Sequence, residues 1–132
     1  MKLLVCGGRD LSDRTGVFAA LDALHAYEPV TLLIEGGARG ADSLAGDWAI
    51  SRGIPRRTFM AEWERHGPAA GPIRNRRMLE EGDPDRVAAF PGGRGTAHMV
   101  RIAEEAAVPV ERMTPQVPKR TGLFALMGKL GR

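Results

Sequence analysis

The chain has 132 residues, of which 43% are hydrophobic, and its formal net charge at neutral pH is +3. This length and composition fit one folded domain with its own core and exclude a disordered chain. No apolar run approaches the roughly 18 residues that span a bilayer, and the chain begins with a strand pattern instead of a signal peptide, so we expect a cytoplasmic protein without a membrane span.

Strand and helix patterns alternate along the chain. Predicted strands cover residues 2–6, 30–35, 56–61, 86–90 and 108–112. Predicted helices cover residues 13–26, 41–52, 72–81 and 97–106, and residues 62–71 are predicted to form a loop. Short strands separated by helices indicate βαβ units and a parallel sheet. We therefore expect an α/β fold, a Rossmann-like three-layer sandwich with about five strands in the order 3-2-1-4-5 and residues 56–61 at an edge.

Three predicted strands end in a pair of glycines with an arginine close behind. These segments, Val5–Arg9, Ile34–Gly40 and Phe90–Thr96, are called the Gly7, Gly36 and Gly92 turns below. Glycine lets the backbone approach a ligand closely, and the N-terminus of the following helix offers free N–H groups that bind anions. A simple tight turn is the alternative, but it seldom needs two glycines. Because the three strands are neighbours in the predicted order, the turns should converge at the switch point of the sheet and bind a phosphorylated ligand.

The positive charge is too scattered for a nucleic-acid surface. Lys and Arg cluster only at residues 74–77 and 119–132, and aromatic residues make up 5% of the chain. The sequence contains no dense basic stripe with interleaved aromatics. Nucleic acid is therefore disfavoured as a partner. We interpret the arginines beside the glycine turns as bidentate hydrogen-bond donors to phosphate or carboxylate.

Four motifs in this order carry a resemblance to a known family: Gly7-Gly8-Arg9-Asp10, residues 35–42, residues 70–75 and residues 91–96. They resemble the YspA-like, cpYpsA-related branch of the SLOG superfamily, which also holds the LOG-type phosphoribohydrolases and the DprA-type proteins that bind single-stranded DNA. The resemblance covers residues 1 to about 113. It implies a Rossmann-like domain that binds nucleotides or nucleotide-derived ligands, but no settled reaction for this branch.

One position departs from the LOG motif Pro-Gly-Gly-x-Gly-Thr-x-x-Glu, whose glutamate takes part in cleaving an N-glycosidic bond. Met99 stands there, and a thioether can neither transfer a proton nor stabilise an oxocarbenium ion. The ionisable neighbour His98 points about 100° away around a helix and is no simple substitute. The resemblance offers Arg74 or Arg77 as the counterpart of the LOG helix arginine. Binding is therefore better supported than hydrolysis.

The predicted function is the binding or sensing of a nucleotide-derived small molecule, such as a mononucleotide or ADP-ribose, with no cofactor and no metal. The alternative is an N-glycosidic or phosphoribosyl hydrolase acting on nucleoside monophosphates or NAD-like compounds, with Asp42, Asp10 and Arg74 as candidate catalytic residues. The expected ligand-binding residues are Gly7, Gly8, Arg9, Gly36, Gly37, Ala38, Gly40, Asp42, Arg74, Asn75, Pro91, Gly92, Gly93, Arg94, Gly95 and Thr96.

Several polar candidates have a structural alternative. Thr96 is most simply the N-cap of its helix, which does not exclude a contact with phosphate. Asp42 lies in a predicted first helical turn and either complements the helix dipole or, like Asp10 and Glu35, accepts hydrogen bonds from ribose or holds an arginine. Surface charge is the default interpretation for Arg76 and Arg77.

The aromatic residues and the cysteine also allow two interpretations. Trp63 and His66 either stack on a base or anchor the predicted 62–71 loop to the core, and anchoring is favoured. Trp48 lies on an apolar helix face and is assigned to the core. Cys6 is interpreted as a buried structural thiol, and the histidines have no metal-ligand spacing.

After residue 113 the pattern changes. Pro115 and Pro118 interrupt the chain, so we expect a basic amphipathic tail over residues 114–132, whose apolar residues dock on the body or on a partner subunit, with membrane-surface contact as the second choice. A homo-oligomer is the prediction, with packing on the same subunit as the alternative. The expected interface also uses a surface that mixes apolar and arginine side chains: Ile73, Arg74, Arg76, Arg77, Met78 and Leu79.

Overall fold

A five-stranded parallel sheet forms the middle layer of the structure, a computed structural model that describes residues 1–117. The strands are β1 (Lys2–Cys6), β2 (Leu32–Glu35), β3 (Arg56–Thr58), β4 (Arg86–Ala89) and β5 (Val110–Arg112). Their order is β3-β2-β1-β4-β5, which confirms the predicted order and the edge position of β3. In the central strand, Leu4 pairs with Ile34 of β2 and with Val87 of β4. Strands β2, β3 and β5 are shorter than predicted.

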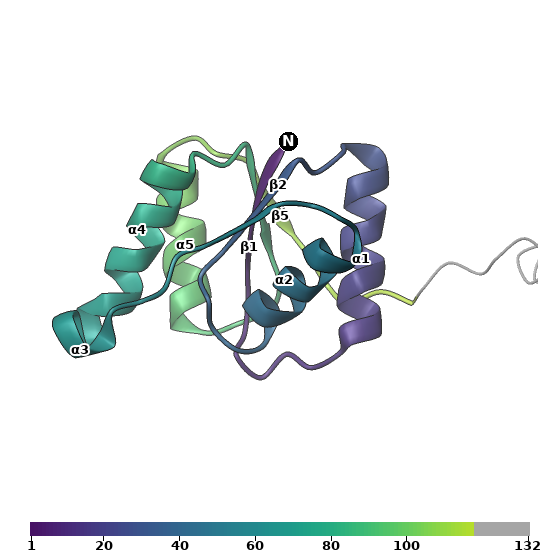
Figure 1. The fold of residues 1–132 in the computed structure, drawn as a ribbon. Coiled ribbons are helices and arrows are strands. Elements are labelled where there is room, and N and C mark those ends of the chain that lie inside the picture. The colour runs from purple at the N-terminus through teal and green to yellow at the C-terminus, as the bar shows by residue number, and fades with distance from the viewer. Residues whose placement is uncertain (118–132) are drawn as a thin grey trace, which may run out of the picture.

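Helices cover both faces of the sheet. Helices α1 (Arg14–Tyr27) and α2 (Ala41–Ser51) lie on one side, and α4 (Ala70–Gly82) and α5 (Arg94–Glu105) lie on the other, as Figure 1 shows. The arrangement confirms the Rossmann-like three-layer sandwich. Among the described residues, none of the helices combines the length and the apolar composition that a membrane crossing requires.

The two faces of the sheet bury separate apolar clusters, because neighbouring strand residues point to opposite sides. Leu3 and Val5 pack with α1 and α2, in a cluster that includes Trp48. Leu4 and Cys6 pack with α4 and α5, in a cluster that includes Met99. The core position predicted for Trp48 is thus confirmed, and its indole N–H donates to Asp22 Oδ1 at 2.8 Å.

The loop predicted for residues 62–71 is wrong, because most of this segment is helical. It contains the short helix α3 (Trp63–His66) and the 3-10 helix η1 (Gly67–Ala69), and α4 already begins at Ala70. Gly67 ends α3 with a φ of 55°, a conformation that glycine adopts without strain. Pro68 and Pro72 lie in first turns, where a missing N–H costs little, so these residues do not exclude helix as their composition suggested.

Helix α5 begins three residues before the predicted position. Gly93 is its N-cap, and the N–H of Ala97 donates to the carbonyl oxygen of Gly93 at 3.0 Å. Thr96 is therefore inside the first turn, and its assignment as N-cap is wrong. Glycine lowers helix propensity by about 1 kcal/mol relative to alanine, so the presence of Gly95 does not indicate a helix at this position.

The surface proposed for oligomer contact is only partly exposed. Met78 is 2% exposed and belongs to the core between α4 and the sheet, and Leu79 is half-buried against the same core. Ile73 is exposed. Residues 118–132 of the predicted amphipathic tail lie outside the described residues. Oligomerisation stays a prediction. Of the three apolar residues proposed for this interface on α4, only Ile73 is exposed.

Candidate functional site

The three glycine turns touch one another at the carboxyl edge of the sheet. The N–H of Gly8 donates to the carbonyl oxygen of Pro91 at 2.8 Å, and the carbonyl oxygen of Gly8 accepts from the N–H of Ala41 at 3.1 Å. Gly40 has a φ of 76°, and a side chain there would overlap the backbone of Gly8 and Arg9. The Gly7 turn is therefore held between the other two, and Gly40 serves this contact.

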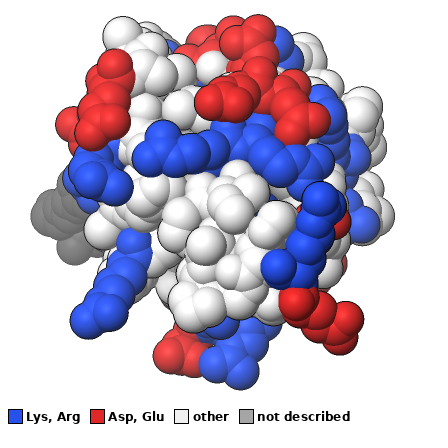
Figure 2. Space-filling model, turned by 90° about the vertical axis from the view of Figure 1, so that its left-hand side faces the viewer, with Lys and Arg blue, Asp and Glu red and all other residues white. Residues whose placement is uncertain are grey.

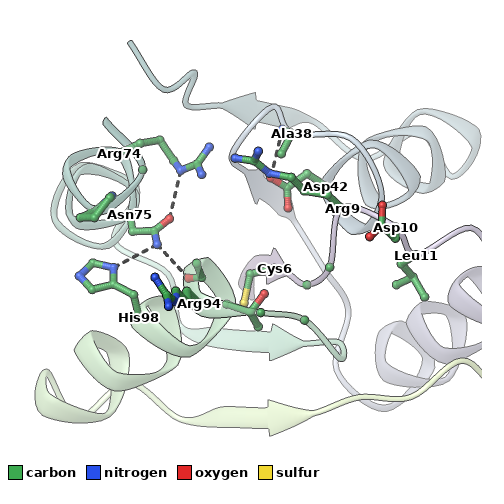
Figure 3. A pocket seen from close by; sticks show the side chains of 18 of the residues that line it. Cys6, Arg9, Asp10, Leu11, Ala38, Asp42, Arg74, Asn75, Arg94 and His98 are labelled. Atoms are coloured by element: carbon green, nitrogen blue, oxygen red, sulfur yellow. Dashed lines mark hydrogen bonds between the residues drawn. The ribbon is translucent and has the colours of Figure 1, made fainter. Parts of the chain in front are cut away.

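A cavity of about 910 Å³ opens where the turns meet (Figure 3). The candidate residues that line it are Gly7, Gly8, Arg9, Asp10, Ala38, Asp42, Arg74, Asn75, Pro91, Gly92, Gly93, Arg94, Gly95 and Thr96. The candidates Gly36, Gly37 and Gly40 are not among the lining residues. Sequence reasoning missed Leu11, Pro68 and Met78, which belong to none of the motifs. It considered Cys6 and His98 without expecting either in the cavity.

The Gly92 turn presents the N-terminus of α5 to this cavity. Residues 91–95 are exposed, and Gly93 has no side chain to cap the first N–H groups of the 12-residue helix. A Cβ atom at Gly93 or Gly95 would meet nothing within 4 Å. A helix N-terminus carries a partial positive charge, so this wall of the cavity is suited to an anion.

The Gly36 turn differs from the open anion site expected there, because carboxylates of the chain already accept its N–H groups. Asp42 Oδ2 accepts from the N–H groups of Gly36 and Ala38, each at 3.2 Å. Glu35 Oε1 accepts from the N–H of Gly37 at 3.2 Å. A phosphate would have to displace these carboxylates. The second turn therefore shapes the cavity through Asp42 and Ala38 rather than by offering free donors.

The carboxyl group of Asp42 titrates far from its ordinary range. Burial raises its pKa from 3.8 to about 6, against the lowering effect of the Ala38 N–H and of the nearby Arg74 guanidinium. Because the folded protein binds this proton more tightly than the unfolded chain, Asp42 stabilises the fold most at low pH, and this contribution is lost as the pH rises through about 6.

We expect Asp42→Asn to remove this pH dependence. Between pH 4 and pH 7 the wild type should lose about 2 kcal/mol of unfolding free energy relative to the variant, because asparagine keeps an accepting oxygen but cannot ionise. Urea unfolding across this range measures the difference. Asp47→Asn, on the same helix but paired with Arg14 at the surface, is the control. Parallel pH profiles for the wild type and Asp42→Asn would contradict this assignment.

A hydrogen-bonded chain joins α4 to the Gly36 and Gly92 turns (Figure 3). Arg74 donates to the carbonyl oxygen of Gly36 and, through Nε, to Asn75 Oδ1 at 3.0 Å. The buried amide of Asn75 donates to the carbonyl oxygen of Gly95 at 3.1 Å. Arg74 and Asn75, which the sequence marked as ligand residues, therefore also fix the two turns relative to each other.

The same chain sets the tautomer of His98. Because Asn75 Oδ1 accepts from Arg74, it is the Asn75 Nδ2 that faces His98 Nδ1, at 3.1 Å. His98 Nδ1 must then accept, which requires a neutral ring with its proton on Nε2. Burial and the nearby Arg101 and Arg76 lower the pKa of His98, in agreement with a neutral ring. Sequence reasoning missed this contact, because α4 and α5 approach each other only in the fold.

The other two acidic candidates lie in different surroundings. Asp10 is at the mouth of the cavity, fully exposed, and forms an ion pair with Arg39 at 3.4 Å. Glu35 is buried and is not a lining residue, and burial raises its pKa. Of the three carboxylates, only Asp42 is both buried and part of the cavity wall.

Cys6 lies at the floor of the cavity. It is a free, buried thiol, and burial raises its pKa to about 12. A thiol in this state is not a nucleophile at neutral pH, so the burial expected for Cys6 is confirmed and its chemistry is inert.

Basic and acidic side chains both lie on the side of α3 and α4. Figure 2 shows Lys and Arg side chains around an uncharged area, with acidic side chains beside them. Arg77, for example, pairs with Glu81 at 2.8 Å, as its interpretation as surface charge implies.

Comparisons with known proteins identify one matching family, one similar phage protein and one solved structure. A model of the YspA, cpYpsA-related SLOG family matches residues 1–66. The chain is 40% identical over 117 residues to the Gene 61 protein of Mycobacterium phage D29, with 83% of this chain and 93% of that protein covered. The DNA processing protein A (DprA) structure from Streptococcus pneumoniae aligns with a TM-score of 0.48 and 17% identity, over 83% of this chain and 58% of that one.

The family match begins at the first residue and contains the Gly7 and Gly36 turns, which touch in the structure and help to form the cavity. Residues 67–117 complete the same sheet and supply the Gly92 turn. The chain belongs to the YspA, cpYpsA-related SLOG family.

Proposed function

We propose that this protein binds a nucleotide-derived small molecule, a mononucleotide or an ADP-ribose-like compound, with a phosphate on the N-terminus of α5. The observation that carries the proposal is the start of this 12-residue helix at the cavity wall, with a glycine N-cap that offers no side-chain acceptor. Backbone N–H groups and the positive end of the helix dipole stabilise a phosphate there.

Two arginines support an anionic ligand. Arg9 and Arg94 line the cavity and, within residues 1–117, form no ion pair, whereas Arg14, Arg52 and Arg86 each have a carboxylate partner. Guanidinium groups match phosphate oxygens in a two-pronged geometry. The open space at Gly93 and Gly95 leaves the backbone accessible to such a group.

Family membership agrees with this proposal at a coarser level, since the SLOG family suggests nucleotide-related binding or processing. Sensing is the form of this function that we favour over hydrolysis. Asp42, the buried carboxylate of the cavity, is engaged in holding the Gly36 turn. A group that holds a turn in place has little freedom to act as a general acid or base.

Arg94→Ala should weaken binding of AMP and ADP-ribose by about 10- to 150-fold, because a hydrogen bond to a charged group contributes about 1.5–3 kcal/mol. Isothermal titration calorimetry with a panel of mononucleotides, NAD and ADP-ribose measures the loss. Arg101→Ala removes the same charge from the same helix outside the cavity and should leave affinity within about two-fold. If no member of the panel binds the wild type, the proposal fails, and equal losses in both variants would reject the assigned subsite.

A further inference from the structure

Trp63 is a partly exposed aromatic residue inside a cavity wall. Its exposure is 47%, and it belongs to neither apolar cluster of the core, which contradicts the interpretation of Trp63 as a core anchor. His66, considered together with it, lines a separate hollow of about 210 Å³ and not this cavity. A large indole surface kept open to solvent in a concave site is typical of ligand recognition.

The surroundings of the indole form an apolar end of the cavity. Trp63 packs against Gly71 at the start of α4, where a Cβ atom would lie 3.4 Å from the ring. Pro68 and Pro72 line the same cavity. The cavity thus has a polar wall at the Gly92 turn and an apolar, aromatic end at α3, η1 and the first turn of α4.

The two residues of α4 that contact these walls lie about one helical turn apart. Gly71, which contacts the indole, precedes Asn75 by four residues, a rise of about 6 Å in an α-helix. Asn75 donates to the carbonyl oxygen of Gly95 in the first turn of α5. One short stretch of α4 therefore contacts both the indole and the first turn of α5, and both line the same cavity.

Arg9 marks the face of the indole that a ligand would use. Its guanidinium carbon lies 5.5 Å from the centre of the Trp63 ring, and both residues line the cavity. Figure 3 shows the Arg9 side chain reaching over the cavity toward Arg74. A planar base stacked on this face would displace the guanidinium, which the phosphates of the ligand then attract.

We propose that Trp63 is the base-stacking residue of this cavity, so that the ligand is a nucleotide that carries its base and not a sugar phosphate alone. This rests on the proposed function, because it assumes a phosphate at α5. The stacking role adds the class of ligand, a nucleotide with its base, and the residue that contacts that base. Stacking tolerates different bases, so Trp63 selects for the presence of a base and not for its identity.

Two probes that differ only in the base test this directly. Calorimetry with AMP and with ribose 5-phosphate should give tighter binding of AMP to the wild type. Trp63→Ala should weaken AMP by about 5- to 150-fold and leave ribose 5-phosphate unchanged, because stacking on an aromatic side chain is lost for AMP alone. Trp63→Phe should restore most of the difference. Circular dichroism melting checks that the variants keep the fold. We expect them to do so, because the Trp63 side chain is exposed and lies outside both core clusters.

Tryptophan fluorescence gives a second readout. Trp48 is fully buried on the other face of the sheet, so AMP should change only the emission of Trp63, and Trp63→Phe should abolish the response. Equal affinity of AMP and ribose 5-phosphate for the wild type, or equal weakening of both by Trp63→Ala, overturns the stacking role while leaving the phosphate site intact. If neither these two probes nor ADP-ribose binds the wild type, the proposed function and the stacking role are overturned together.

Discussion

Met99→Glu should strongly destabilise the domain at neutral pH. Met99 is fully buried in the apolar cluster between α5 and the sheet, and this cluster offers no partner for a carboxylate. Burying an unpaired charge there should cost about 4 kcal/mol or more, a large part of the roughly 5–15 kcal/mol that stabilises a typical domain. Because the new glutamate enters the core only when protonated, the variant should regain stability as the pH falls toward 4.

Urea unfolding with circular dichroism measures this loss. Met99→Leu is the matched control and should cost less than about 1.5 kcal/mol, since it conserves volume and polarity. If Met99→Glu remains as stable as the wild type at pH 7, then residue 99 can reach solvent or the cavity. The position would then be open to the catalytic carboxylate that the LOG motif carries.

The protein should release little or no free base from nucleoside monophosphates. A positioned general acid or base contributes about 10²–10⁴-fold to a rate, and the side chain at the position of the LOG glutamate is an apolar core residue here. The two carboxylates of the cavity do not replace it. Asp10 is exposed and paired with Arg39, and Asp42 accepts two backbone hydrogen bonds.

Chromatographic detection of adenine released from AMP provides the measurement. The wild type, Asp42→Asn and Asp10→Asn should all stay near the background rate. Robust release by the wild type that Asp42→Asn abolishes would contradict the binding function and make the protein a hydrolase with a relocated carboxylate. Release that survives in both variants would point to a contaminating enzyme.

The strand order could be predicted because alternating strands and helices indicate a doubly wound parallel sheet, in which the strands that end in glycine turns are neighbours. Residues that end β1, β2 and β4 need close backbone approach, and only neighbouring strands bring such turns together. Residues 62–71 could not be predicted in the same way. Their proline and glycine content suggested a loop, but proline in a first turn and glycine at a helix end are compatible with short helices.

Most lining residues of the cavity could be predicted from the sequence motifs, but the hydrogen-bonding state of the backbone N–H groups could not. The sequence indicates that the Gly36 turn has N–H groups, but not that Asp42 and Glu35 accept them. Whether Asp42 accepts these N–H groups depends on where α2 begins, and its start is set by the close contact of Gly40 with Gly8. The burial of Met99, by contrast, could have been predicted, because Met99, Val100, Ile102 and Ala103 follow the spacing of an apolar helix face.

A phosphate on the N-terminus of α5 is the central claim, and amide chemical shifts test it most directly. Titration of ¹⁵N-labelled protein with AMP should shift the backbone amides of Gly93, Arg94, Gly95 and Thr96 most strongly, because these N–H groups would donate to the phosphate. The amides of Gly36, Gly37 and Ala38 already have carboxylate acceptors and should move less. Saturable shifts centred on the Gly36 turn, or no saturable shift in either turn, would contradict the claim.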